Sequence, residues 1–291
     1  MSDLIVAPEV FIDTLDAKKH SSKMVLLSSL PFADGRDRSK FLEDWLARYP
    51  QFVPARSGEY EPFPWKFDAD NPASFTERWS TDLYWRSKKP RTLAHIACPL
   101  TIPIPNWPTH SSLWLRGAFN AVQRKELVEM ADHLASKMAI DFGIVHHISE
   151  YDVRRASARE LLGLLDPEKN RWMLSLPSHA IRYGLPDVFW KTYFGPPYVE
   201  MMGEALLLSA PAFEVSKLDQ GIIAIQLTES LDDCLNTPEL VDAARNRLID
   251  HLGAEYFNSF YDPMDPRRVP PHDPDHPVKV PKFRFSPQQF A

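Results

Sequence analysis

Hydrophobic residues in the first ninety positions form short, separated patterns. The apolar run Met24–Leu27 predicts a strand. Ser39 is placed to cap a helix over Lys40–Tyr49 that Pro50 ends, with its apolar residues on one face. A second helix is expected to open at Ser74 and to continue through Phe75, Trp79 and Leu83.

The clearest pattern runs from Thr92 to Ile148. Strands are predicted over Thr92–Cys98, Leu113–Phe119 and Phe142–Ile148. Between the last two, Asn120 is a helix cap with Gln123 in the reciprocal position of a capping box, followed by one apolar stripe. A strand, a helix and a strand joined by a long crossover permit a βαβ unit.

Many of the segments that connect the predicted elements are rich in proline. Residues 50–72 and 99–108 carry so many prolines that we expect ordered, irregular loops. The basic run Arg86–Arg91 is predicted to be a solvated turn. Further on, a short helix is expected over Arg159–Leu165 and a strand over Trp172–Leu176.

The segment Gly184–Thr228 is interpreted as the structural centre of the chain. Its core motif, Phe194–Glu200, predicts a rigid buried turn, because two adjacent prolines fix φ and aromatic residues lie on both sides. The turn is expected to lead into strands over Ala205–Leu208 and Ile222–Leu227. The motif residues assigned this structural role are Gly195, Pro196, Pro197, Tyr198 and Glu200.

The last regular element is a helix that begins at Thr237-Pro238-Glu239 and ends at Gly253. Eight of the thirty residues from Asp262 onward are proline. The alternating Val278, Val280, Phe283 and Phe285 favour an extended arm over 277–285 that docks on the body.

Together these patterns predict an α+β fold: an antiparallel or mixed sheet with packed helices, Pro-rich loops and an extended C-terminal arm. Three ranges are expected. An N-terminal α/β and aromatic, Pro-rich region (1–90) packs on an α+β core (91–261), and a Pro-rich tail (262–291) follows.

Composition narrows the class of protein. The 291 residues are 44% hydrophobic and 25% charged, typical of a globular protein, with a formal net charge of -6. This charge argues against nucleic acid as the partner. With two cysteines, no signal-peptide pattern and no apolar run long enough to cross a bilayer, we expect a cytoplasmic protein without a disulfide framework or membrane partner.

No catalytic motif in the sequence demands an enzymatic function. Phosphate-loop, GxSxG and CxxC spacings are absent. His146-His147 with Glu150 is the best metal-like cluster, but neighbouring strand residues point to opposite faces, so we expect one buried and one exposed histidine. Glu200 and Glu204 are interpreted as a solvated helix face. The sequence therefore predicts no enzyme, no metal and no cofactor.

Several stretches resemble immunity protein family 52 of bacterial polymorphic toxin systems. They are Gly184–Trp190, Phe194–Glu200, Ser209-Ala210-Pro211, Ile225–Thr228 and the helix Glu239–Leu252, within residues 92–260. The resemblance implies a protein that binds and neutralises a restriction-endonuclease-like nuclease toxin delivered by type VI secretion. It brings no catalytic residues with it.

The predicted toxin-binding surface is an acidic segment without Lys or Arg. Its five acids are Glu229, Asp232, Asp233, Glu239 and Asp242. An acidic loop can imitate the DNA backbone toward a basic nuclease surface. The alternative is a plain solvated loop, with the aromatic loop Phe52–Phe67 as the binding surface. Two other functions stay open: a hydrolase with a site assembled from distant His, Asp and Glu residues, and a structural adaptor of a secretion system.

Overall fold

The computed structural model describes residues 22–30, 37–59, 62–77, 79, 82–97, 110–148, 152, 162–166, 171–174, 176, 180–257 and 278–285. Within this part of the chain, one ten-stranded sheet forms the body, and every neighbouring pair of its strands is antiparallel. Helices pack on it, and the C-terminal arm is extended. The α+β prediction is confirmed, with an antiparallel sheet.

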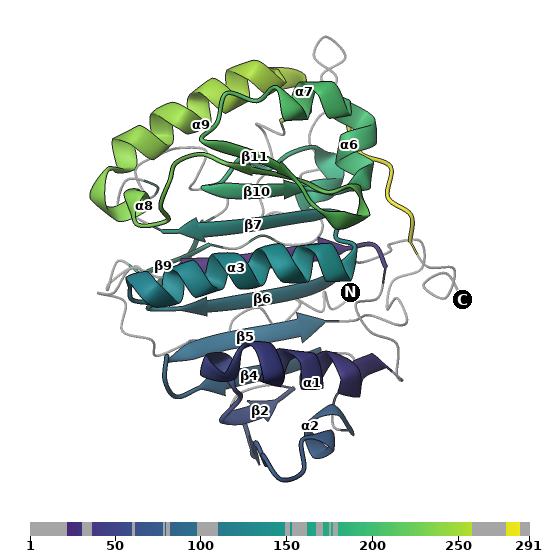
Figure 1. Cartoon of the computed structure of the whole chain (residues 1–291), viewed down its shortest axis with the longest axis vertical. Coiled ribbons are helices and arrows are strands. Elements are labelled where there is room, and N and C mark those ends of the chain that lie inside the picture. Colours follow the sequence, from purple (N-terminus) through teal and green to yellow (C-terminus); the bar gives the residue numbers. More distant parts are fainter. Residues whose placement is uncertain are drawn as a thin grey trace, which may run out of the picture.

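The order of the strands in the sheet is β11-β12-β10-β7-β1-β6-β5-β4-β2-β3, and Figure 1 shows most of them stacked from top to bottom. Their bounds are β1 Ser22–Ser28, β2 Arg56–Gly58, β3 Trp65–Lys66, β4 Asp82–Ser87, β5 Thr92–Ala97, β6 Ser111–Gly117, β7 Phe142–His147, β10 Lys191–Phe194, β11 Glu214–Lys217 and β12 Ile223–Gln226. A separate hairpin pairs β8 (Leu162–Asp166) with β9 (Arg171–Leu174).

Strand β1 occupies the middle of the sheet, and all seven of its residues are buried. It pairs antiparallel with β6 on one side and β7 on the other, so β6 and β7 run in the same direction. The predicted crossover unit is thus present with β1 inserted between its two strands. The sheet also crosses the expected boundary at residue 90, where β4 pairs with β5; the division into three ranges stays a prediction.

Seven α-helices are described: α1 Asp37–Arg48, α2 Ala73–Glu77, α3 Ala121–Met138, α6 Pro196–Met202, α7 Glu204–Leu208, α8 Asp233–Asn236 and α9 Pro238–Leu252. Short 3₁₀ turns lie at Pro50–Phe52, Ala180–Tyr183, Asp219–Gly221 and Ala254–Tyr256. In Figure 1, α3 and α1 cross one face of the sheet, and α6 to α9 gather around the end formed by β10, β11 and β12.

Helix α3 packs on the sheet through buried apolar side chains and through an ion pair. Its predicted stripe, which includes Leu127, Met130 and Leu134, is buried. Its polar anchor is Asp132, which accepts hydrogen bonds from Lys191 Nζ at 2.9 Å and from Tyr193 Oη at 2.8 Å. Both donors belong to β10, so the ion pair fixes the helix against that strand.

Two local predictions were wrong. The helix expected from Ser74 to Leu83 ends at Glu77, and Leu83 is a buried residue of β4. The helix expected over Arg159–Leu165 is contradicted by β8, because residues 162–165 belong to a hairpin strand. In both cases strand pairing with a partner later in the chain overrides a weak local helical pattern.

The Pro-Pro motif is a helix start and not a buried turn. Gly195 is the N-cap of α6, and Pro196 and Pro197 occupy its first positions, where a missing N–H costs nothing. Pro196 is exposed, while Tyr198 is fully buried and donates its hydroxyl to the Ile181 carbonyl at 3.0 Å. The strand expected over Ala205–Leu208 is instead helix α7.

The Pro-rich region 50–72 is ordered as predicted but less irregular than expected, because it contains a 3₁₀ turn and the strands β2 and β3. Phe52 and Phe63 are buried, and the ring of Phe52 meets that of Phe119 edge-to-face at 5.8 Å. The turn after β4 covers Lys88–Arg91, four of the six residues of the basic run, and is mostly exposed, whereas Arg86 and Ser87 belong to β4. The short strands β2 and β3 lie at one edge of the sheet, where proline is tolerated nearby.

The C-terminal arm is docked on the body. The backbone N–H of Lys279 donates to the Glu255 carbonyl at 2.7 Å. The Phe283 ring lies 4.5 Å from the ring of the buried His110 and 6.1 Å from that of Tyr198. The buried side of the arm differs from the expected alternation at one position. Val280, which was expected to dock, is 46% exposed, and the neighbouring Pro281 is buried.

These contacts predict how the arm responds to proteolysis. Phe283→Ser removes the ring that packs between His110 and Tyr198, so we expect limited proteolysis within 278–285 to become roughly tenfold faster. Val280→Ser is the control, because its side chain is already half in solvent. Equal cleavage of the two variants at the wild-type rate would show that Phe283 does not hold the arm.

Candidate binding surface

The acidic segment follows strand β12 and continues into α9. Its first residues are held by the core: Trp190 Nε1 donates to Thr228 Oγ1 at 3.0 Å. The buried Gln226 side chain donates to the carbonyls of Thr228 at 2.9 Å and Glu229 at 3.1 Å. The loop therefore leaves the sheet in one fixed conformation.

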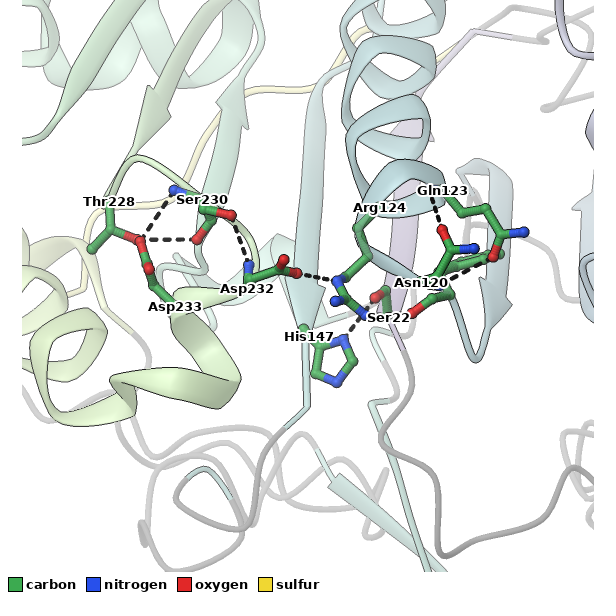
Figure 2. Close-up of polar contacts among 10 residues, drawn as sticks. Ser22, Asn120, Gln123, Arg124, His147, Thr228, Ser230, Asp232 and Asp233 are labelled. Carbon is green, nitrogen blue, oxygen red and sulfur yellow. Dashed lines mark hydrogen bonds and ion pairs between the residues drawn. The ribbon is translucent and has the colours of Figure 1, made fainter.

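Two of the five predicted acids are engaged inside the molecule (Figure 2). Asp232 forms an ion pair with Arg124 of α3, and Figure 2 shows the two side chains pointing at each other. The Asp233 carboxylate accepts the backbone N–H of Ser230 at 3.1 Å, and Ser230 Oγ accepts the N–H of Asp232 at 3.2 Å. These contacts order the loop that precedes α8.

Arg124 is itself positioned by the start of α3. The capping box predicted there is present: Asn120 Oδ1 accepts the Gln123 N–H at 2.9 Å, and Gln123 Oε1 accepts the Asn120 N–H at 3.1 Å (Figure 2). Arg124 also donates to the Phe119 carbonyl. The first turn of α3 thus presents a fixed cation to Asp232.

The other three acids differ in their surroundings. Glu229 and Glu239 are exposed, and neither carboxylate has a hydrogen bond or ion pair within the described part of the chain. Asp242 is half-buried and accepts a hydrogen bond from Asn246 at 3.4 Å. The structure adds Leu240, which is 52% exposed directly beside Glu239.

Sequence reasoning missed both Leu240 and Arg124. Leu240 lies off the buried stripe of α9, which consists of Val241, Ala244, Leu248 and Leu252 together with Arg245. Helical periodicity alone would therefore have placed Leu240 toward solvent. Nothing in the sequence pairs Arg124 with an acid 108 residues away.

The ion pair leads to a stability prediction. Both side chains are mostly buried, so Asp232→Lys sets two cations against each other and should lower the free energy of unfolding by about 1–3 kcal/mol. The double variant Asp232→Lys/Arg124→Asp should recover part of this loss, measured by urea unfolding. Additive losses in the double variant would exclude a direct interaction.

Other predicted polar groups have structural surroundings. His146 and His147 are both buried, so the expectation of one exposed histidine was wrong; His147 Nδ1 lies 2.7 Å from Ser22 Oγ. Glu200 and Glu204 are exposed but belong to separate helices, and Glu204 pairs with Lys217 at 2.7 Å. Among the residues that the structure describes, no three His, Cys, Asp or Glu side chains are arranged so that they could hold one metal ion.

The aromatic loop is less suited to binding than its composition indicates. Phe52 and Phe63 are buried, and Trp65 and Phe67 are half-buried against the core. Most of this aromatic surface already contacts the protein itself. The acidic segment therefore remains the better candidate.

Comparisons with known proteins do not assign this chain to a family. No family model matches the chain, and no curated protein matches it. A solved structure named as a Pseudomonas aeruginosa T6SS protein is 12% identical, with a TM-score of 0.42, over 79% of this chain and 76% of that one. Values this low establish neither a shared family nor a shared function, so membership of immunity protein family 52 stays a prediction.

Across the described ranges, none of the helices has the length and apolar character needed to span a bilayer. The cytoplasmic location stays a prediction.

Proposed function

We propose that this chain is an immunity protein that binds and neutralises a nuclease toxin delivered by type VI secretion. The observation that carries the proposal is the fixed acidic segment from the end of β12 to the first turn of α9, where Glu229, Glu239 and Leu240 face solvent. The resemblance of five stretches of the sequence to immunity protein family 52 supplies the class of partner. The role proposed is that of an inhibitor, without catalysis or cofactor.

The charge of this surface suits a nuclease that binds DNA. Such a toxin needs basic residues for phosphates, and exposed carboxylates can pair with those residues in place of the DNA backbone. Glu229 and Glu239 are available for this purpose, whereas Asp232 already neutralises Arg124. Leu240 adds an apolar contact beside the charges, the usual combination in a protein interface.

The rigidity of the segment favours tight binding. Hydrogen bonds from Trp190 and Gln226, together with the ion pair to α3, order the loop before any partner arrives. A preformed surface loses little conformational freedom on association, so more of the contact energy remains as affinity. The contacts of Asp232 and Asp233 would then support the surface and not touch the toxin.

A charge reversal tests this assignment. Glu229→Lys/Glu239→Lys should slow association with the toxin about tenfold at low salt, and less at high salt, because steering depends on exposed charge. The double variant Glu43→Lys/Glu77→Lys is a matched control: both residues are exposed, the net charge changes equally, and they lie on α1 and α2. Equal association rates for both double variants would move the interface away from α9.

Co-expression decides between the proposal and the two open alternatives. The chain should restore growth to cells that produce its cognate nuclease toxin, in proportion to the amount of complex recovered. Turnover on an ester or phosphoester panel would instead favour a hydrolase. Stable association with secretion components but not with the toxin would favour an adaptor.

A further inference from the structure

A buried cluster brings together a thiol, an imidazole, a carboxylate and a guanidinium. Cys234 Sγ of α8 lies 4.0 Å from His146 Nδ1 of β7. His146 Nε2 lies 3.2 Å from the Asp152 carboxylate, which also pairs with Arg245 of α9 at 3.2 Å. Cys234 is only 2% exposed, and the other three side chains are buried as well. The proposed binding function uses none of these groups.

Hydrogen bonding indicates where the imidazole proton lies. The backbone N–H of Trp190 approaches His146 Nδ1 at 3.3 Å, so this nitrogen carries a lone pair. The proton is then on Nε2, where it faces Asp152. The Cys234 sulfur lies 4.0 Å from the same nitrogen, so the thiol competes with the Trp190 N–H for this lone pair. A nucleophile, a base and a carboxylate that orients the base are thus arranged in sequence.

The surroundings stabilise the imidazolium that forms when His146 accepts the thiol proton. Burial alone lowers the pKa of His146, but the Asp152 carboxylate and Cys234 outweigh burial and raise this pKa to about 9. The charged groups near the ring come from several elements. Asp152 contacts the His146 ring, and Arg245 pairs with Asp152. The negative charge of Asp187 in turn raises the pKa of Arg245. Asp242 lines the same cavity.

A small cavity lies beside the sulfur. Cys234, His146, Asp152 and Arg245 line it together with residues of α9, and its volume of about 10 Å³ is close to that needed by one water molecule. Arg245 Nε has no hydrogen-bond partner among the described residues, although the side chain is buried. The cavity therefore offers an unused donor to a small oxygen-bearing group.

We propose that Cys234 is a nucleophilic thiol that His146 activates toward small hydroperoxides, hydrogen peroxide above all. The thiol gives its proton to Nδ1 of His146, and the sulfur attacks one peroxide oxygen. An S–O bond forms as the O–O bond breaks, and the departing hydroxide takes the proton from His146 and leaves as water. Sulfur is oxidised by two electrons to a sulfenic acid, and the peroxide is reduced. Arg245 Nε then donates to the new oxygen.

The test uses the full, reduced chain and hydrogen peroxide at pH 7, with a 1,3-dione to trap sulfenic acid. Peptide mass spectrometry follows Cys234 and Cys98 separately. Cys234 should react in first order in peroxide, and about tenfold or more faster than the same thiol in urea. Modification at a rate that does not depend on peroxide concentration, equal to the rate of global unfolding, would overturn the proposal.

Variants separate activation from simple burial. His146→Gln should slow the reaction of Cys234 about tenfold or more and remove the titration of His146 from the pH profile of the rate. His147→Gln is the matched control, because this neighbouring buried histidine contacts Ser22 instead; its rate should stay within about twofold of wild type. Equal rates in the two variants would contradict activation by His146. If His146→Gln does not fold, the order of the wild-type reaction in peroxide decides alone.

Discussion

Replacing Asp152 with alanine should lower the free energy of unfolding by about 3–5 kcal/mol, because it leaves a buried guanidinium without its carboxylate. Arg245 is 3% exposed and pairs with Asp152 at 3.2 Å. The same carboxylate lies 3.2 Å from His146, so two buried cationic or polar groups lose their partner at once. Urea unfolding of the purified variants measures the loss.

A second acidic residue, exposed and also in an ion pair, serves as the control that separates the effect of burial from the effect of losing a charge. Glu204→Ala breaks an ion pair with Lys217 of similar length, but both side chains are about half exposed, so its cost should not exceed about 1 kcal/mol. Asp152→Asn should fall between the two, since the amide can still accept from Arg245. An Asp152→Ala loss no larger than that of Glu204→Ala would show that Arg245 is satisfied in another way, for example by Asp187.

Elements with a strong local pattern were predictable from the sequence. The apolar stripe and the capping box of α3 predict the helix, and the apolar runs on both sides of it predict β6 and β7. The insertion of β1 between these strands was not predictable. It depends on pairings between residues about a hundred positions apart, which no local pattern encodes.

Short apolar runs were ambiguous for a physical reason. Ala205–Leu208 contains no polar residue and is too short to reveal a period, so it fits a buried strand as well as a helix. Gly203 decides the outcome, since it adopts a φ of +89° that separates α6 from α7. Pro196 and Pro197 were similarly ambiguous, because proline serves both turns and helix starts.

The candidate sites were only partly visible in the sequence. Acids cluster between Glu229 and Asp242 in the sequence itself, but the structure alone distinguishes the exposed Glu229 and Glu239 from Asp232, which Arg124 binds. The contact between Cys234 and His146 joins residues 88 positions apart. Sequence spacing carries no signal for a pair that meets only through the fold.

Gly195→Ala should be among the most damaging single substitutions in the chain. A Cβ at this position would lie 2.0 Å from the Ile140 carbonyl oxygen and 2.7 Å from Asp141 Cα, both backbone atoms that cannot rotate away. The Gly195 N–H also donates to the Asp141 carbonyl at 2.9 Å, so relieving the clash would break this bond between the start of α6 and the segment before β7. We expect a loss of about 3 kcal/mol or more.

Gly203→Ala distinguishes this crowding from backbone strain. A Cβ at Gly203 meets nothing within 4 Å, but the φ of +89° is unfavourable for alanine, so the expected loss is only about 1–2 kcal/mol. Thermal and urea unfolding of both variants provide the measurement. If Gly195→Ala proves no more destabilising than Gly203→Ala, the backbone at residues 140–141 can move enough to admit a methyl group beside Gly195. Lack of space for a side chain would then not explain why glycine occupies position 195.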